Sequence, residues 1–320
     1  MKQFLDPEAI ITSLEIALSK PFDYPVAARR LNGSISHISG GALHIRKSNN
    51  YYRFFEYKDG QQKYLGRSSN RLYELARRKY CGLLLRALKS TFFESNDSKA
   101  TATSDLAAFI RLLAAANLDV ARVVLTSKQY EWYTKSYKQK ANNTTPVLNT
   151  EGGSRVRSKS EKDIGNELEN YAAPYHFEEC LRFNVRDLVE TLADNLNLRP
   201  QNGSLFHYIN GSCYSNVPKE LEWMNTDGSM WRSYDTNTGL ITIYPDFRIM
   251  LADGSFLYWE HEGLVDKFIY RCNASEREII LRYSADVPRA NLITTFEKDT
   301  LDSMRVGEII KNEILPRLFW

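Results

Sequence analysis

Two adjoining strand-like runs near residue 250 constrain the fold more than any other part of this 320-residue chain. Residues 239–251 (GLITIYPDFRIML) are largely apolar and β-branched, and residues 255–263 (SFLYWEHEG) begin with an aromatic and apolar run that ends in Glu-His-Glu. Asp253 and Gly254, which lie between the two runs, form a tight-turn pair. The pattern therefore predicts an antiparallel hairpin, which commits the C-terminal half of the chain to a sheet.

The alternation of side chains along these strands brings acids together. Glu260 and Glu262 share one face of the second strand, and pairing through the turn places Asp246 of the first strand close to Glu260. Carboxylates that converge among apolar neighbours repel one another unless a cation neutralises them. An all-oxygen site of this kind suits Mg²⁺ or Mn²⁺. The alternative is that these acids are exposed salt-bridge partners at a sheet edge.

The segments around the hairpin predict a mixed α/β order. We expect, in order, a helix that begins at Ser160, a strand, an insertion, the hairpin, a helix, a strand and a closing helix interrupted by Pro316. Their approximate ranges are 158–172, 174–183, 184–238, 239–263, 264–285, 291–297 and 304–319. Within the insertion, residues 185–196 (VRDLVETLADNL) predict one extra helix.

Three short motifs occur in this order: S-K-S-E at 158–161, Y-P-D-F at 244–247 and W-E-H-E-G at 259–263. Together they resemble the PD-(D/E)xK nuclease superfamily. The resemblance implies a restriction-endonuclease-like αβββαβ core and a Mg²⁺-dependent endonuclease that hydrolyses phosphodiester bonds in nucleic acid, with DNA as the expected substrate. It also implies that Asp246 bridges the metal, that Glu260 is a second ligand, and that Glu161 completes or orients the shell.

Glu262 departs from the superfamily pattern, which has a lysine two positions after the second acid. An acid on this face can act as a general base or a metal ligand. The missing positive charge then has to come from Lys267, Arg271 or Arg277 on the following helix, or from a second metal ion. The departure is also typical of lost activity, so the alternative is a catalytically degenerate nucleic-acid-binding or interaction protein on the same fold. His261 is expected to face Trp259 in a structural role.

Charge is divided unevenly between the two halves of the chain. Residues 1–157 contain 25 Lys and Arg against 13 Asp and Glu, whereas residues 158–320 contain 17 against 26. A basic half joined to an acidic half favours a polyanion-binding module attached to a metal-using one. Two surfaces of opposite sign that dock on each other would give the same division.

The basic half contains a second sheet signal. Residues 43–47, 51–57 and 62–66 predict a three-stranded antiparallel meander with a turn at Asp59-Gly60, and a long helix is expected from Asn70. This α+β unit resembles the small N-terminal DNA-binding domains of phage integrases. Basic side chains that alternate with aromatic ones are the candidate DNA contacts: Arg46, Lys47, Arg53, Lys58, Lys63 and Arg67. Alternatively, they simply make this face soluble. Further helices are expected at 7–19, 103–117 and 119–138.

The polar stretch 138–160 lacks apolar periodicity and predicts a linker. We therefore expect a basic N-terminal domain at 1–140, a linker at 141–157 and a nuclease-like domain at 158–320 with an insertion at about 184–238. With 43% hydrophobic and 25% charged residues, the chain is typical of a globular protein. The sequence contains neither a secretion signal nor a long apolar run, which predicts a cytoplasmic protein without a membrane partner. A homodimer is left open.

Overall fold

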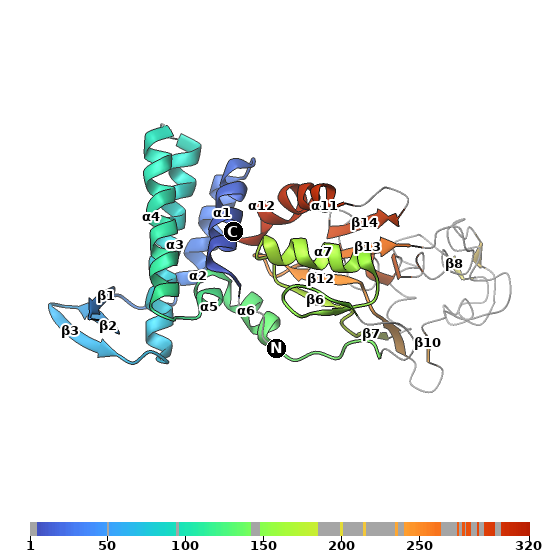
Figure 1. Cartoon of the computed structure of the whole chain (residues 1–320), viewed down its shortest axis with the longest axis horizontal. Helices are drawn as coiled ribbons and strands as arrows, with labels where there is room; N and C mark the ends of the chain where they lie inside the picture. Colours follow the sequence, from blue (N-terminus) through green and yellow to red (C-terminus); the bar gives the residue numbers. More distant parts are fainter. Residues whose placement is uncertain are drawn as a thin grey trace.

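A computed structural model describes most of the chain. The described residues are 5–49, 51–93, 96–141, 148–184, 199–200, 214–215, 234–235, 240–263, 274, 277–278, 280–282, 287, 291–297 and 302–320. The protein is a mixed α/β structure in which a helical part lies beside a sheet that is built from the C-terminal half (Figure 1). In the part of the chain that the structure covers, we find no helix that is both long and apolar enough to cross a membrane.

The helical part is formed by α1 (Pro7–Ser19), α2 (Tyr24–Ile35), α3 (Asn70–Phe93), α4 (Asn96–Ala115), α5 (Val120–Val124) and α6 (Ser127–Thr134). The expected helix at 7–19 is confirmed, and α4 begins before the expected residue 103. The single helix expected at 119–138 is wrong, because the chain leaves α5 at Leu125 and starts again in α6. Thr126 and Gln129 form a capping box that begins this new helix. Helix α2 was not expected.

The three-stranded meander is confirmed as β1 (Ala42–Ser48), β2 (Tyr51–Lys58) and β3 (Gln61–Leu65). Asp59 and Gly60 both take positive φ in the turn between β2 and β3, which is the geometry that this dipeptide favours. Leu43, Phe54 and Leu65 are buried and point to one face, against α3. The sheet extends from the helical part at the end of the molecule away from the C-terminal sheet (Figure 1).

The C-terminal sheet has the strand order β14-β13-β12-β6. Its strands are β6 (Tyr175–Phe177), β12 (Phe247–Met250), β13 (Phe256–Glu262) and β14 (Leu292–Phe296). The first three are antiparallel neighbours, and β14 is added parallel to β13. The hairpin turn at Asp253-Gly254 is confirmed, with Gly254 at a φ of +85°. The strand expected at 291–297 is confirmed as well.

Two strands that were expected to be continuous are each broken in two. The run 174–183 divides into β6 and β7 (Leu181–Asn184), and the run 239–251 divides into β11 (Leu240–Ile243) and β12. Glu178 interrupts the first run with a φ of +48°, and Pro245, which lacks an N–H group, interrupts the second. Strands β7 and β11 pair in a separate sheet with β10 (Tyr234–Asp235). Both breaks therefore occur where the chain passes from one sheet to the other.

The N-cap of helix α7 (Lys159–Asn170) lies two residues before the expected one. Ser158, not Ser160, is the N-cap, and its hydroxyl accepts a hydrogen bond from Glu161 N at 3.1 Å. The carboxylate of Glu161 in turn accepts one from Ser158 N at 3.0 Å. This reciprocal pair fixes the start of the helix, because Ser158 and Glu161 have the S-x-x-E spacing of a capping box.

The C-terminal segment closes on both parts of the molecule. It consists of α11 (Ser303–Ile309), a π-helical turn (Ile310–Ile314) and α12 (Leu315–Leu318). Gln129 of α6 donates hydrogen bonds of 3.0 Å to the carbonyl groups of Met250 and Leu318. A contiguous set of buried apolar side chains reaches from α1 through α3 to the C-terminal sheet and Trp320. The two halves therefore share one hydrophobic core.

The expected linker contains a short hairpin, β4 (Leu148–Asn149) paired with β5 (Arg155–Val156). Thr150 in its turn donates a hydrogen bond of 2.6 Å to Glu169 of α7, which holds the hairpin against that helix. The domain division at 141–157 stays a prediction. The expected helix at 185–196 lies outside the described residues, as does most of the insertion. Only scattered positions of the expected helix at 264–285 are described, and those at 274, 277–278 and 280–282 are helical.

Candidate functional site

Three carboxylates form a row across neighbouring strands of the C-terminal sheet. Phe177, Phe247 and Trp259 are register partners on β6, β12 and β13. One step further toward the same edge, each segment carries an acid: Glu178 directly after β6, Asp246 directly before β12, and Glu260 on β13. The backbone N–H of Glu178 donates to Asp246 O at 3.1 Å. Asp246 lies between Glu178 on one side and Glu260 on the other. We call Glu178, Asp246 and Glu260 the acid row.

Asp246, at the centre of the row, is enclosed by its neighbours. Its Oδ2 atom accepts a hydrogen bond of 2.7 Å from the backbone N–H of His261. Burial, followed by the charge of Glu260, raises the pKa of the Asp246 carboxyl well above its ordinary value. The expected proximity of Asp246 and Glu260 is therefore present in the fold, and it has a measurable electrostatic consequence.

Arg277 provides the positive charge beside Glu260 and Glu262. Its Nε donates to Glu260 at 2.9 Å, and its Nη2 donates to Glu262 at 3.1 Å. Both carboxylates are almost fully buried, and burial is the main reason that their pKa values are raised. Among the described residues, Oε1 of Glu260 and Oε2 of Glu262 have no hydrogen-bond partner. Each acid thus has one oxygen on Arg277 and one oxygen unpaired.

Arg277 is one of the three cations that the sequence offered in place of the motif lysine. It approaches Glu262, the residue that occupies the lysine position, and Glu260 at the same time. Lys267 and Arg271, the other two candidates, lie outside the described residues.

Glu178 was missed by the sequence analysis. It is 5% exposed, and its carboxylate lies 2.8 Å from a terminal nitrogen of Arg157. Burial raises the pKa of Glu178 to about 7, against the opposing charge of Arg157, and the acids Glu161 and Glu260 also contribute to the rise. The sequence does show two acids, Glu178 and Glu179, directly after the aromatic run 175–177. Because we expected one unbroken strand through residue 183, Glu178 was not predicted to belong to the site.

Glu161 is close to the row, although its carboxylate is already engaged. Its Oε2 accepts hydrogen bonds from the backbone N–H groups of Arg157 and Ser158, at 2.7 and 3.0 Å. Its charge nevertheless contributes to the raised pKa values of Asp246 and Glu178. The structure therefore gives Glu161 a capping role beside the acid row, and the sequence analysis assigned it only a place in the metal shell.

His261 lies on the opposite face of β13 from the acids, beside Trp259 as expected. Its Nδ1 is 3.1 Å from Thr295 Oγ1 and its Nε2 is 2.7 Å from Glu297. The indole N–H of Trp259 donates to the same Thr295 hydroxyl at 2.9 Å. These contacts join β13 to β14 and hold the strand that carries Glu260 and Glu262 in place.

The donor chemistry of the site suits a hard cation. Asp246 and Glu260 offer carboxylate oxygens at the same point of the sheet, and the unpaired Oε1 of Glu260 is available for a ligand bond. In the described part of the chain, no three His, Cys, Asp or Glu side chains are arranged so that together they could hold a metal ion. A metal would therefore have to share Glu260 with Arg277, or draw Asp246 and Glu260 together.

The six basic residues predicted to contact DNA do not share one face of the meander. Arg46 and Arg53 are directly paired across β1 and β2 on the face away from α3, and both are exposed. This exposed face also carries Phe55, Tyr57 and Tyr64. By strand alternation Lys47, Lys58 and Lys63 belong to the other face, and Arg67 follows the end of β3.

Comparisons with protein-family models, with curated proteins and with solved structures gave no match for this chain. The resemblance to the PD-(D/E)xK superfamily therefore stays a prediction from the sequence motifs. The site is argued from its own geometry: an acid row at the end of three strands, one arginine that binds two of the acids of this site, and an exposed basic face at the far end of the molecule.

Proposed function

We propose that the protein is a metal-dependent nuclease that hydrolyses phosphodiester bonds of DNA on a restriction-endonuclease-like core. The acid row carries this proposal, because Glu178, Asp246 and Glu260 lie side by side on neighbouring chain segments, and Glu178 and Glu260 are only 5% and 3% exposed. Such a concentration of negative charge has a high free energy without a cation, which favours a divalent ion as the natural occupant.

The order of elements supports the core that the motifs imply. Helix α7 precedes the three antiparallel strands β6, β12 and β13, helical residues follow near 274–282, and β14 is added parallel to β13. This order agrees with an αβββαβ core. The insertion falls between β6 and β12, so it lengthens a connection and leaves the central hairpin intact.

Asp246 and Glu260 would hold the metal, while Glu178, beside them in the row, is paired with Arg157. When bound, Mg²⁺ polarises the scissile phosphate and lowers the pKa of a coordinated water molecule. Glu262 would then hold Arg277 beside the reaction centre, where the guanidinium group stabilises negative charge on the phosphate. The Glu262–Arg277 pair thus takes the place of the motif lysine.

The exposed face of the meander is proposed to bind the phosphate backbone. Arg46 and Arg53 are directly opposite each other on antiparallel strands, and like charges in that position repel. A phosphate between them would remove the repulsion. Arg46 also lies over the ring of Phe55, 5.3 Å from its centroid, which holds the guanidinium group at the surface.

The test is cleavage of linear and circular DNA by the purified full chain with Mg²⁺ or Mn²⁺. We expect cleavage that EDTA stops and that Asp246→Ala and Glu260→Ala each abolish. Asp105→Ala, which removes an exposed acid on α4, is the matched control and should cut like the parent. If Asp246→Ala and Glu260→Ala cut as well as the parent, the acid row is not the active site.

The second candidate is a non-cleaving protein that binds nucleic acid on the same fold. The double ion pair of Arg277 favours it, because Arg277 already neutralises part of the charge on Glu260 and Glu262. Titration calorimetry with Mn²⁺ separates the two candidates. If the protein is a nuclease, Asp246→Ala should abolish the heat of Mn²⁺ binding that the parent shows. If the site is degenerate, the parent and Asp246→Ala should give the same heat.

A further inference from the structure

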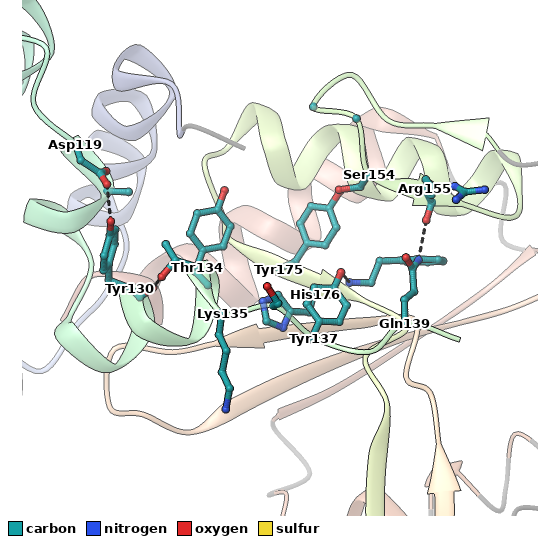
Figure 2. Close-up of a pocket in the computed structure, with 16 residues that line it drawn as sticks. Asp119, Tyr130, Thr134, Lys135, Tyr137, Gln139, Ser154, Arg155, Tyr175 and His176 are labelled. Atoms are coloured by element: carbon teal, nitrogen blue, oxygen red, sulfur yellow. Dashed lines mark hydrogen bonds between the residues drawn. The ribbon is translucent and has the colours of Figure 1, made fainter. Parts of the chain in front are cut away.

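A cavity of about 450 Å³ lies beside the acid row. Its walls are α6, the segment after α6, the turn between β4 and β5, and strand β6 (Figure 2). Four tyrosines line it: Tyr130, Tyr133, Tyr137 and Tyr175. We call it the tyrosine cavity. Its volume is within the range of small-ligand sites, and its walls combine aromatic rings with hydroxyl and amide groups.

A stack of three rings ends at this cavity. His176 lies 4.1 Å from Trp132 on one side and 4.0 Å from Tyr137 on the other, centroid to centroid, and the Tyr137 ring is tilted by only 16° from His176. His176 is fixed by Glu179, which lies 2.9 Å from its Nδ1. Tyr137 is the outer ring of the stack and is 39% exposed. The stack therefore gives the cavity an anchored aromatic surface that is partly open to solvent. Tyr137 and His176, two neighbouring rings of the stack, overlap in the close-up of the cavity (Figure 2).

A smaller cavity of about 280 Å³ continues from the tyrosine cavity towards the acid row. The two cavities share Gln139 and Arg155, and the smaller one is also lined by Lys140, Arg157 and Glu178. We call this smaller cavity the basic groove. Glu178 belongs both to the groove and to the acid row, so the groove connects the tyrosine cavity with the proposed reaction centre.

Exposed positive charge follows the same path. Lys135, Lys138, Lys140 and Arg155 are all exposed. Lys140 also lies over the ring of Tyr244, two residues before Asp246, at 5.7 Å from the centroid. The acids in the walls are engaged: Asp119 accepts from Tyr130, and Glu178 lies 2.8 Å from Arg157. Among the described residues, positive charge therefore predominates along this path.

We propose that the tyrosine cavity binds an unpaired base of a single-stranded nucleic acid, stacked on Tyr137, while the basic groove holds the adjoining phosphates. The inference rests on the proposed function, since it leads the strand to the acid row. An aromatic ring that stacks a base beside cations that hold the backbone is the usual arrangement for single strands. A base in a duplex is already stacked on its neighbours, so it would have to leave the helix to enter.

The test is binding of a fluorescein-labelled eight-nucleotide oligothymidylate to the full chain, measured by anisotropy in EDTA. Tyr137→Ala should weaken binding by about ten-fold, which is the usual size of one stacking contact. Tyr137→Phe keeps the ring and loses only the hydroxyl that accepts from Phe177 N, so it should bind like the parent. Phe93→Ala, an exposed aromatic at the far end of α3, is the matched control. Equal affinity of Tyr137→Ala and the parent overturns the proposal.

Two further measurements separate the base from the phosphates. An oligonucleotide of abasic sites should bind the parent weakly and should show no difference between the parent and Tyr137→Ala. Arg155→Gln with Lys140→Gln should weaken both oligonucleotides, and Lys89→Gln on α3 is the control for charge. A blunt duplex of the same length should be insensitive to Tyr137→Ala. If the abasic strand and the duplex lose as much affinity as oligothymidylate in Tyr137→Ala, no base enters the cavity.

Binding in EDTA keeps this inference separate from the proposed function. If DNA is cut only with Asp246 intact but Tyr137→Ala binds oligothymidylate like the parent, the proposed nuclease function is supported and the cavity assignment is wrong. If no metal-dependent cleavage is found but oligothymidylate binding depends on Tyr137, the cavity assignment stands and the nuclease fails. A thermal melt of each variant shows that it is folded before its affinity is compared.

Discussion

The meander and the acid row both carry clustered charge, but they hold it in opposite ways. Arg46 and Arg53 lie on an exposed strand face, where water and salt screen their repulsion. Glu260 is buried and Asp246 is half-buried, so loss of solvation, with neighbouring acids adding to it, raises the pKa values of both carboxyl groups. Like charges can therefore be gathered on a surface at little cost, whereas a buried charge requires a partner.

The meander and the C-terminal sheet, which carries the acid row, lie on opposite sides of the helical part (Figure 1). A nucleic acid held by the meander would have to pass along the helical part to reach the acid row. Binding and cutting should therefore be separable by mutation. The basic groove provides contacts next to the acids that do not depend on the meander.

Loss of a metal ligand should have the largest effect. Asp246→Asn removes the negative charge and keeps the shape of the side chain, so we expect the rate at saturating DNA to fall about a thousand-fold or more. The double variant Arg46→Gln with Arg53→Gln should keep that rate and raise only KM. Steady-state cleavage assays measure both values, and a loss of kcat in the arginine double variant would show that the two regions are not independent.

Removal of Arg277 should be the next largest effect, seen in stability. Arg277→Met leaves Glu260 and Glu262 buried beside each other without their cation, which costs about 3–5 kcal/mol in comparable pairs. Urea unfolding measures the loss, and Arg86→Met, from an exposed pair with Asp105, should cost less than about 1 kcal/mol. If the carboxylates bind metal, Mn²⁺ should recover part of the stability of Arg277→Met. Equal losses for the two variants would contradict the account.

The acid row should also make stability depend on pH. The pKa of Glu178 rises from an ordinary 4.5 to about 7 in the folded chain, so the folded state holds an extra proton between these values. The free energy of unfolding should therefore fall as pH rises from about 4.5 to about 7, by up to about 3 kcal/mol from this group. Glu178→Gln should flatten the dependence, and the exposed Glu131→Gln should leave it unchanged. Urea melts at pH 5 and pH 7.5 give the comparison; an unchanged slope in Glu178→Gln would refute it.

The smallest effect should come from the meander. Arg46→Gln with Arg53→Gln should weaken duplex DNA binding about ten-fold and reduce the salt slope by about two. Because it removes a repulsive cross-strand pair, the change should not lower the stability of the protein. Anisotropy titrations over a range of salt concentrations measure both affinity and slope. A salt slope identical to that of the parent would remove the meander from the binding surface.

Regular local patterns were predictable from the sequence. Helix α1, the meander, the Asp253-Gly254 turn and β13 follow from short-range signals, and strand alternation was enough to bring Asp246 near Glu260. These features depend on neighbours in sequence, where propensity and periodicity act directly.

Features that depend on tertiary contacts were not predictable. The breaks at Glu178 and Pro245 occur because the chain moves between two sheets, and the pattern of apolar residues does not change there. For this reason Glu178 was not predicted as a residue of the site. Ser158 and Ser160 both have cap chemistry, and the reciprocal bond with Glu161 selects Ser158. The sequence likewise could not show which of the three candidate cations lies beside Glu260 and Glu262; in the structure it is Arg277.

The most direct measurement of the central claim is a crystal of the full chain soaked in Mn²⁺, examined by anomalous diffraction. The account predicts a peak about 2.2 Å from carboxylate oxygens of both Asp246 and Glu260, and no peak there in crystals of Asp246→Asn. A peak elsewhere, with the hydrogen bonds of Arg277 to Glu260 and Glu262 unchanged, would contradict a metal site in the acid row.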